Sequence, residues 1–228
     1  MGHLIELKDI YKIYRTGDAE VHALDGVSLE IDNGEFVSIV GQSGSGKPTL
    51  MNLLGCLDTP TMGTYLLDGV DVSTMSDNRL SDIRNRRIGF IFQGFNLISS
   101  LNAIENVELP LIYRKMERKE RKKLVYQSLS RVGLKKRMRH RPSEMSGGQQ
   151  QRVAIARAIA ASPPIIFADE PTGNLDSKSG EEVIRILREL NQEGRTVILI
   201  THDNGIARRC DRVIHIHDGK ITLDERLA

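Results

Sequence analysis

A glycine-rich loop at Gly41–Thr49 contains the residues of this sequence that could most directly do chemistry. Glycines at positions 41, 44 and 46 let backbone N–H groups turn toward phosphate oxygens, and Lys47 adds a positive charge. The loop follows the apolar run Phe36–Val40 and precedes a stretch with helical spacing, so a helix N-terminus would add its positive dipole end. These flanks disfavour the alternative, a glycine-rich turn without a ligand. The residues predicted to contact phosphate are Gly41, Gln42, Ser43, Gly44, Ser45, Gly46, Lys47, Pro48 and Thr49.

Pro48 departs from what such a loop requires. The pattern has Ser or Thr directly after the lysine, because that hydroxyl binds the Mg²⁺ ion that accompanies the phosphates. Proline supplies neither a hydroxyl nor a backbone N–H, and Thr49, about 100° further round the helix, cannot simply replace the lost ligand. One missing donor to a charged phosphate costs about 1.5–3 kcal/mol, or about 10- to 100-fold in affinity. We expect weakened Mg²⁺-nucleotide binding and strongly reduced hydrolysis, although proline in a first helical turn leaves the fold intact.

Two adjacent carboxylates end another apolar run, Pro164–Glu170. In a nucleotide site Asp169 would hold Mg²⁺ through water, and Glu170 would polarise the water that attacks the terminal phosphate. Taken alone, the two acids could instead cap the turn that follows them. The phosphate-binding loop in the same chain favours the catalytic interpretation.

A second helix start of the anion-binding kind lies at Ser146–Gln149. Ser146 is a predicted N-cap, Gly147 and Gly148 permit close approach of the backbone, and Gln149 opens the helix. From these residues alone, an ordinary helix preceded by glycines is an equal alternative.

The elements that must position these residues alternate between strands and helices. Apolar runs at Phe36–Val40, Ile165–Ala168 and Val197–Ile200 are typical of buried parallel strands. Segments with helical spacing lie at Leu50–Leu57, Gln149–Ala161 and Glu181–Leu190, the last placed between Gly180 and Gly194. This alternation predicts an α/β sheet covered on both faces. A period of two at Leu4–Tyr14 and Val27–Ile31 predicts antiparallel strands near the N-terminus.

Lys and Arg crowd into a mostly helical stretch from about Gly94 to Pro142, which we interpret as an inserted lobe. For this charge run we favour a solvated helix face over a specific anion-binding role. We predict one domain over residues 1–228, with a nucleotide-binding core at 1–93 and 143–228 and a helical subdomain at 94–142. Cys56 and Cys210 lack metal or disulfide spacing and are predicted to be small buried or half-buried apolar residues. His215 and His217 alternate along a strand, and we interpret them as its solvated face.

The order of these motifs resembles the ATP-binding subunits of ABC transporters, because SGGQ at 146–149 lies just before the acidic strand. The resemblance implies a P-loop NTPase (RecA-like) α/β core with an N-terminal antiparallel β-subdomain and an inserted helical subdomain, and ATP and Mg²⁺ as cofactors. It also implies that Gln93, in GFIFQGFNL, contacts the metal and the attacking water. His202, in LITHD, would contact the γ-phosphate.

The same resemblance assigns the remaining ligand contacts. Tyr14 would stack on adenine, with Tyr11 a competing candidate, and a core or edge-strand role is nearly as plausible for each. Asn174–Asp176 would cross a dimer interface. The SGGQ element would face the γ-phosphate held by a second copy, which implies a head-to-tail dimer around two ATP molecules.

Stretches such as GCLDTPTMGTYLLDG resemble the lipoprotein-release, macrolide-efflux and antimicrobial-peptide-export group within the family. That resemblance implies membrane permease subunits, contacted through Phe95–Leu101, and in part of the group a periplasmic or extracellular adaptor protein. The expected location is cytoplasmic, on the inner face of the membrane through the permease. No signal peptide or membrane-spanning run is found in the sequence.

Other classes of protein remain as alternatives. A formal net charge of +2 gives no basic excess, so we expect no nucleic-acid partner. DNA-repair ATPases of the family would need long coiled-coil insertions, and translation-type members usually carry two cassettes. If Pro48 is decisive, the chain is instead a cassette that binds nucleotide without hydrolysing it.

Overall fold

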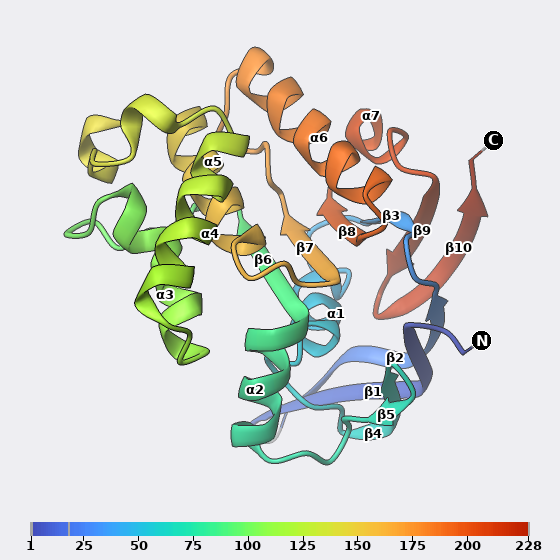
Figure 1. Ribbon diagram of the computed structural model, residues 1–228. Helices are drawn as coiled ribbons and strands as arrows, with labels where there is room; N and C mark the ends of the chain where they lie inside the picture. The colour runs from blue at the N-terminus through green and yellow to red at the C-terminus, as the bar shows by residue number, and fades with distance from the viewer. Residues whose placement is uncertain (1, 18, 228) are drawn as a thin grey trace. The chain divides into compact units, whose positions relative to one another are not determined.

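The computed structural model describes residues 2–17 and 19–227, and the chain divides into two compact units, coloured along the sequence in Figure 1. The first compact unit is Met1–Arg84 together with Thr196–Ala228, and the second is Asn85–Arg195. The predicted boundaries of the helical subdomain, at 94 and 142, stay a prediction.

Two groups of strands form in the first compact unit. An antiparallel sheet has the order β2-β1-β4-β5, and a second group has the order β10-β9-β3-β8, in which β3 runs parallel to both of its neighbours. The strands are β1 (Ile5–Thr16), β2 (Ala19–Ile31), β3 (Phe36–Val40), β4 (Met62–Leu67), β5 (Val70–Asp71), β8 (Thr196–Thr201), β9 (Arg212–His217) and β10 (Lys220–Arg226).

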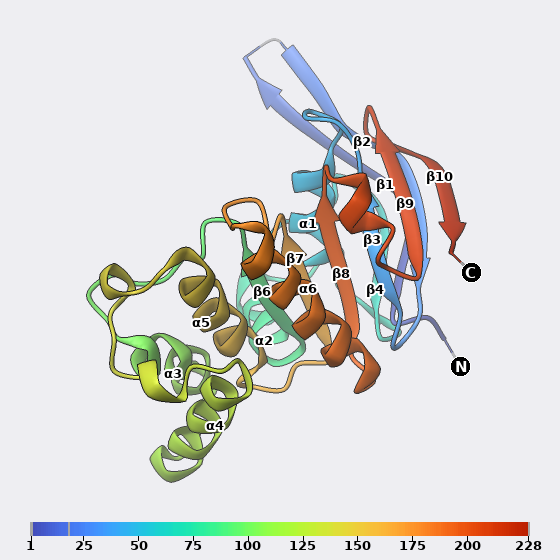
Figure 2. The ribbon, with the colours of Figure 1, turned by 90° about the horizontal axis from the view of Figure 1, so that it is seen from above.

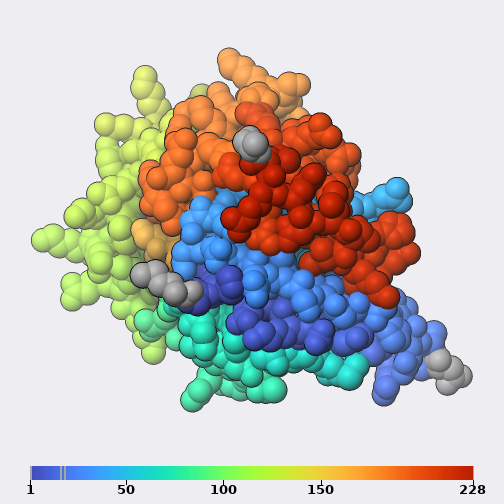
Figure 3. Space-filling model, turned by 90° about the vertical axis from the view of Figure 1, so that its right-hand side faces the viewer, coloured from blue at the N-terminus to red at the C-terminus, as the bar shows by residue number. Residues whose placement is uncertain are grey.

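The two N-terminal strands pair as the period-two pattern predicts, and they run longer than predicted. The antiparallel register pairs Ile5 with Ile31 near one end and Tyr14 with Val21 near the other. Figure 2 shows this hairpin alongside β9 and β10, and contacts link β10 to β2. Figure 3 shows the same strands sharing one face of the surface.

The central strand β3 is apolar because both of its faces are covered. All five of its residues are buried, including Ser38, whose hydroxyl donates to the backbone carbonyls of Ala207 and Arg212 at 3.2 and 3.3 Å. A buried hydroxyl needs such partners, since an unpaired one costs free energy. The prediction of a buried parallel strand here is confirmed with the same bounds.

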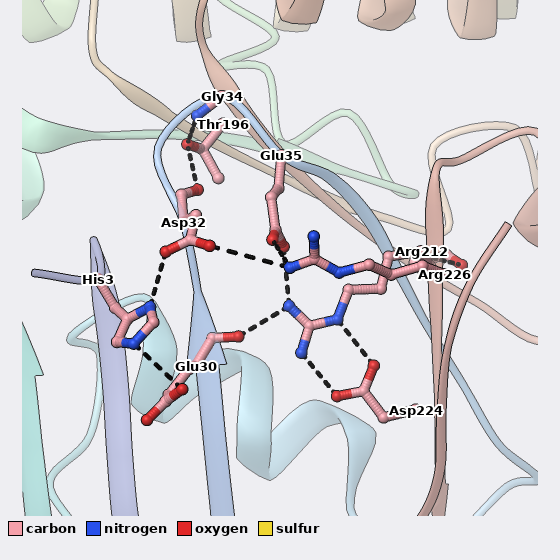
Figure 4. A network of polar contacts seen from close by, with 10 residues as sticks. His3, Glu30, Asp32, Gly34, Glu35, Thr196, Arg212, Asp224 and Arg226 are labelled. Carbon is pink, nitrogen blue, oxygen red and sulfur yellow. Dashed lines mark hydrogen bonds and ion pairs between the residues drawn. The ribbon is translucent and has the colours of Figure 1, made fainter. Parts of the chain in front are cut away.

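A buried arginine joins the strand ends of the first compact unit (Figure 4). Arg212, on β9, binds both carboxylate oxygens of Asp224, on β10, at 2.7 and 2.6 Å. Its other contacts are Glu35 and the carbonyl of Glu30, each at 2.8 Å, and Arg226 also binds Glu35. A guanidinium with a carboxylate on two sides fixes the start of β3 against β9 and β10.

The helices of the first compact unit include α1 (Lys47–Leu54), which begins inside the glycine-rich loop, and the short α7 (Asn204–Ala207). Helix α2 covers Asp77–Arg87. Cys56 and Cys210 are buried, as predicted.

The second compact unit contains two parallel strands and mostly helical segments. Its elements are β6 (Ile88–Phe92), α3 (Ala103–Tyr113), α4 (Arg118–Arg131), η1 (Lys135–Arg137), η2 (Pro142–Glu144), α5 (Gly147–Ile159), β7 (Ile165–Asp169) and α6 (Ser177–Gln192). The prediction that α6 begins after Gly180 is wrong. Asp176 caps this helix by accepting a hydrogen bond from the Ser179 amide at 3.0 Å, so Gly180 lies inside it.

Candidate nucleotide site

The glycine-rich loop folds as a tight turn between β3 and α1. Gly46 has φ 100° and caps α1, and a Cβ there would lie 2.5 Å from the carbonyl oxygen of Ala23, so only glycine fits. Gly44 has φ 81° with open space beyond its Cα. The loop thus presents bare backbone on its outer side and packs closely on its inner side.

Two polar groups in this loop match phosphate chemistry. The Lys47 ammonium donates hydrogen bonds to the carbonyl oxygens of Gly41 and Gln42, at 2.6 and 2.7 Å, and Lys47 is only 7% exposed. The hydroxyl of Ser45 is buried and makes no hydrogen bond within residues 2–17 and 19–227. A buried donor without a partner is costly, so this hydroxyl suits an added acceptor such as a phosphate oxygen.

Pro48 occupies the second position of α1 and is exposed. The first backbone N–H groups of a helix have no partner inside it, and they are the groups that bind anions at a helix start. Proline removes one of these donors. Thr49, in the same turn, lies close enough to the Tyr14 hydroxyl to lower the pKa of that group.

His202 is brought beside the loop by strand pairing. The parallel register of β3 and β8 pairs Val40 with Thr201, so Gly41 and His202 are the next residues of adjacent strands. His202 is exposed. The following Asp203 caps α7 by accepting hydrogen bonds from the amides of Gly205 and Ile206, at 2.7 and 3.2 Å, which fixes the turn that carries the histidine.

Of the two candidate tyrosines, Tyr14 has the more open ring. Its side chain is 39% exposed, and its hydroxyl donates to Asp58 at 3.1 Å. Burial raises the pKa of Tyr14, the Asp58 carboxylate raises it further, and the nearby Thr49 hydroxyl opposes both. The Tyr11 hydroxyl instead packs against Gly26, where an added Cβ would lie 3.1 Å away.

In the second compact unit, parallel pairing brings Gln93 and the acidic pair to one sheet edge. Phe92 pairs with Asp169, so Gln93 and Glu170 are the next residues of adjacent strands. Glu170 has φ 43°, which costs a non-glycine residue about 1–3 kcal/mol. Such a conformation turns the chain sharply after the buried strand and leaves Asp169 and Glu170 half-buried.

The helix start at Ser146 has the predicted cap. Its hydroxyl accepts from the Gln149 amide at 3.4 Å, and the Gln149 side chain accepts from the Ser146 amide at 3.2 Å. Gly148 has no room for a side chain, since a Cβ would lie 2.4 Å from the Ser179 hydroxyl. Gly147 is half-buried and Ser146 exposed, so the amide end of this helix is open on one side.

Two contacts tie Gln93 to the segment after Glu170. The Asn174 amide donates to the Gln93 carbonyl at 3.0 Å. A Cβ on Gly173 would lie 2.6 Å from the Gln93 amide nitrogen, so this glycine makes room for the glutamine.

Gln151 is not among the site residues predicted from the sequence. Its side chain is fully buried and its amide donates to the Pro171 carbonyl at 2.7 Å, one residue after Glu170. It therefore joins α5 to the chain just after the acidic pair. The signal was a polar side chain three residues after buried Gly148 and four before buried Ile155, on the inner face of the helix.

The residues present fit a nucleoside triphosphate better than they fit its metal. The loop offers bare backbone, the Ser45 hydroxyl, the Lys47 ammonium and a helix start. The hydroxyl that would bind Mg²⁺ beside the phosphates is missing at Pro48. Among the described residues no group of three or more His, Cys, Asp or Glu could hold a metal ion.

Comparison with known proteins agrees with this geometry. Residues 24–173 match the "ABC transporter" family. An uncharacterized ABC transporter ATP-binding protein of Bacillus subtilis, YvrO, is 51% identical over 98% of this chain and 97% of its own length. The macrolide export ATP-binding/permease protein MacB of Hyphomonas neptunium is 54% identical over 97% of this chain, which spans only 34% of that protein.

A solved structure has the same fold. The dimeric ATP-binding cassette MJ0796 of Methanocaldococcus jannaschii, in a post-hydrolysis state bound to ADP and Pi, matches with a TM-score of 0.91 and 47% identity. The match covers 98% of this chain and 99% of that one. The chain therefore belongs to the ABC transporter family, as an ATP-binding cassette. The predicted resemblance and fold class are confirmed. None of the described helices combines the length and apolar character that a membrane crossing needs.

Proposed function

We propose that this chain is the ATP-binding and ATP-hydrolysing subunit of an ABC transporter of the export or lipoprotein-extraction type. The observation that carries the proposal is the glycine-rich loop, with a buried unpaired hydroxyl at Ser45 and a lysine ammonium beside a helix start. The Ser45 hydroxyl lacks a partner among the described residues, and together with the lysine charge it suits an anion with several oxygens. Family membership makes that anion the phosphate chain of ATP.

The proposed roles follow the residue chemistry. Lys47 and the loop amides bind the β- and γ-phosphates, and His202 contacts the γ-phosphate. Glu170 accepts the proton of the attacking water, which Gln93 orients. Mg²⁺ would be held through Asp169 and Gln93, and would neutralise charge on the phosphates.

Two copies would close head to tail, with Ser146, Gly147, Gly148 and Gln149 of each facing the γ-phosphate bound by the other. A capped helix start with open amides is suited to that contact. Support for pairing comes from the dimeric state of the cassette MJ0796.

The transport-coupled role would require a membrane permease, and MacB is named as an ATP-binding and permease protein in one chain. We propose that Phe95–Leu101 receives the permease at the inner face of the membrane, with an adaptor protein outside. Asn106 holds this strip, since its fully buried amide donates to the carbonyls of Ile98 and Leu101, both at 3.1 Å. Arg157 donates to the carbonyls of Phe95 and Asn96. A strip held this rigidly can transmit force.

Pro48 favours a second candidate, a cassette that binds nucleotide without hydrolysing it. A soluble ATPase without a transport partner ranks below both.

Titration calorimetry with ATP and Mg²⁺, phosphate release and light scattering would test these proposals on four proteins: the chain, Pro48→Ser, Glu170→Gln and the exposed control Glu181→Gln. We expect ATP-dependent dimers in Glu170→Gln, and phosphate release that is slow in the chain, faster in Pro48→Ser and unchanged in Glu181→Gln. Binding without hydrolysis, in the chain and in Pro48→Ser alike, would favour the second candidate. Absence of ATP binding in both would refute the function.

A further inference from the structure

Three side chains of the first compact unit form a connected cluster, which we call the Tyr14 clamp: Lys12, Tyr14 and Asp58. The Tyr14 hydroxyl donates to one carboxylate oxygen of Asp58 at 3.1 Å. Lys12 binds the other carboxylate oxygen at 2.6 Å and the Thr59 carbonyl at 2.8 Å. The Thr49 hydroxyl lies near this cluster and lowers the pKa of Tyr14.

The clamp connects Tyr14 to the segment that follows the helix beginning in the phosphate-binding loop. Asp58 lies four residues after Leu54, the last residue of α1. The position of Asp58 is fixed, because its backbone amide donates to the Asn52 carbonyl at 3.2 Å and its side chain accepts from the Thr59 amide at 2.8 Å. The hydroxyl of Tyr14 therefore keeps one position relative to the loop.

Lys12 also shapes how the ring of Tyr14 can be used. Its ammonium lies 5.1 Å from the ring centroid, within the range of a cation–π contact. The Lys12 side chain is only 13% exposed, whereas Tyr14 is 39% exposed. Lys12 therefore contacts the ring of Tyr14, while part of the tyrosine stays exposed and open to a flat ligand.

The Asp58 carboxylate and the Lys12 ammonium form an ion pair within the clamp. Burial raises the pKa of Asp58, but hydrogen bonds from Lys12, the Thr59 amide and Tyr14 outweigh burial, and the pKa lies below its ordinary value. The carboxylate is thus ionised at neutral pH and accepts from the tyrosine and the lysine together.

We propose that Asp58 and Lys12 are positioning residues that hold the Tyr14 ring at a fixed distance from the phosphate-binding loop, so that a nucleotide base stacks on the ring while its phosphates occupy the loop. This inference rests on the proposed function. It predicts that the clamp contributes to binding of ligands that carry a base, and not to binding of a bare phosphate chain. Fixing the ring in advance removes an ordering cost that binding would otherwise include.

The test compares ATP with inorganic tripolyphosphate, which lacks base and sugar, by titration calorimetry with Mg²⁺. The variants are Tyr14→Phe, which keeps the ring and removes the hydroxyl, Asp58→Ala, and the double variant. Tyr113→Phe, which removes an exposed hydroxyl in the second compact unit, is the matched control. Each is made in the chain and in the Pro48→Ser background, and circular dichroism verifies folding.

We expect Tyr14→Phe and Asp58→Ala each to weaken ATP binding about 3- to 10-fold, the range of lost hydrogen bonds, with tripolyphosphate binding unchanged. The double variant should be no weaker than the stronger single one, because both remove the same link. If Asp58→Ala fails to fold, the comparison of ATP with tripolyphosphate in Tyr14→Phe alone tests the inference. Equal losses for ATP and tripolyphosphate would make the clamp merely structural, and no loss for either ligand would also overturn the inference. If neither background binds either ligand, the proposed function itself fails.

Discussion

Replacing Pro48 with serine should change the ATP affinity and the free energy of unfolding in opposite directions. Pro48 is the second residue of α1 and exposed, so the new backbone N–H finds no partner within the helix and stays available to a phosphate. That donor contributes about 1.5–3 kcal/mol of binding free energy, or about 10- to 100-fold in affinity. The free energy of unfolding should fall by about 0.4–1 kcal/mol, because proline restricts the unfolded chain.

The assay separates the N–H from the hydroxyl by adding Pro48→Ala as the control, since alanine restores only the N–H. ATP affinity is measured by calorimetry with Mg²⁺ and again with a chelator, and unfolding is followed in urea. We expect alanine and serine to gain equally in the chelator. With Mg²⁺, serine should gain further, because its hydroxyl can bind the ion.

Two results would refute this reasoning. Equal ATP affinities and equal ATPase rates for all three proteins would mean that position 48 contributes no contact. An equal gain by alanine and serine in Mg²⁺ would mean that the hydroxyl does not reach the metal, and that only the missing N–H matters.

Two further predictions concern stability. Gly148→Ala should lower the free energy of unfolding by about 1–3 kcal/mol, because its Cβ would lie 2.4 Å from the Ser179 hydroxyl. Gly180→Ala should raise the free energy of unfolding by about 0.5–1 kcal/mol, because its Cβ would meet nothing nearer than 3.6 Å and alanine is the better helix former. Urea unfolding that ranks the two variants in the opposite order would contradict this packing. A hydrogen bond with Asp32 raises the pKa of His3 above its ordinary value of 6.5; burial opposes this shift and nearby carboxylates add to it. The contribution of the protonated His3 to the free energy of unfolding is therefore complete below pH 6.5 and is lost as the pH rises through the folded-state pKa. The melting temperature of His3→Ala should therefore fall below that of the parent at about pH 5.5 and match it at about pH 8.5, and an equal difference at both would contradict the linkage.

The sequence predicted the local parts of this protein well, because they depend on neighbours along the chain. Phe36–Val40 is a strand with the predicted bounds, and Ser146 caps its helix as expected. The predicted start of α6 after Gly180 is wrong, because the Asp176 cap stabilises an earlier start and outweighs the poor helix propensity of glycine.

By itself the sequence determined which chemical groups the phosphate-binding loop has, and that Pro48 has neither a hydroxyl nor a backbone N–H. Both follow from the covalent structure of the residues alone. Tertiary structure decided which groups stand side by side. The register of β3 and β8 puts His202 next to Gly41, and folding brings Asp58 to Lys12. These partners are 46 or more residues apart in the chain, and no local pattern encodes a contact that only sheet pairing and burial create.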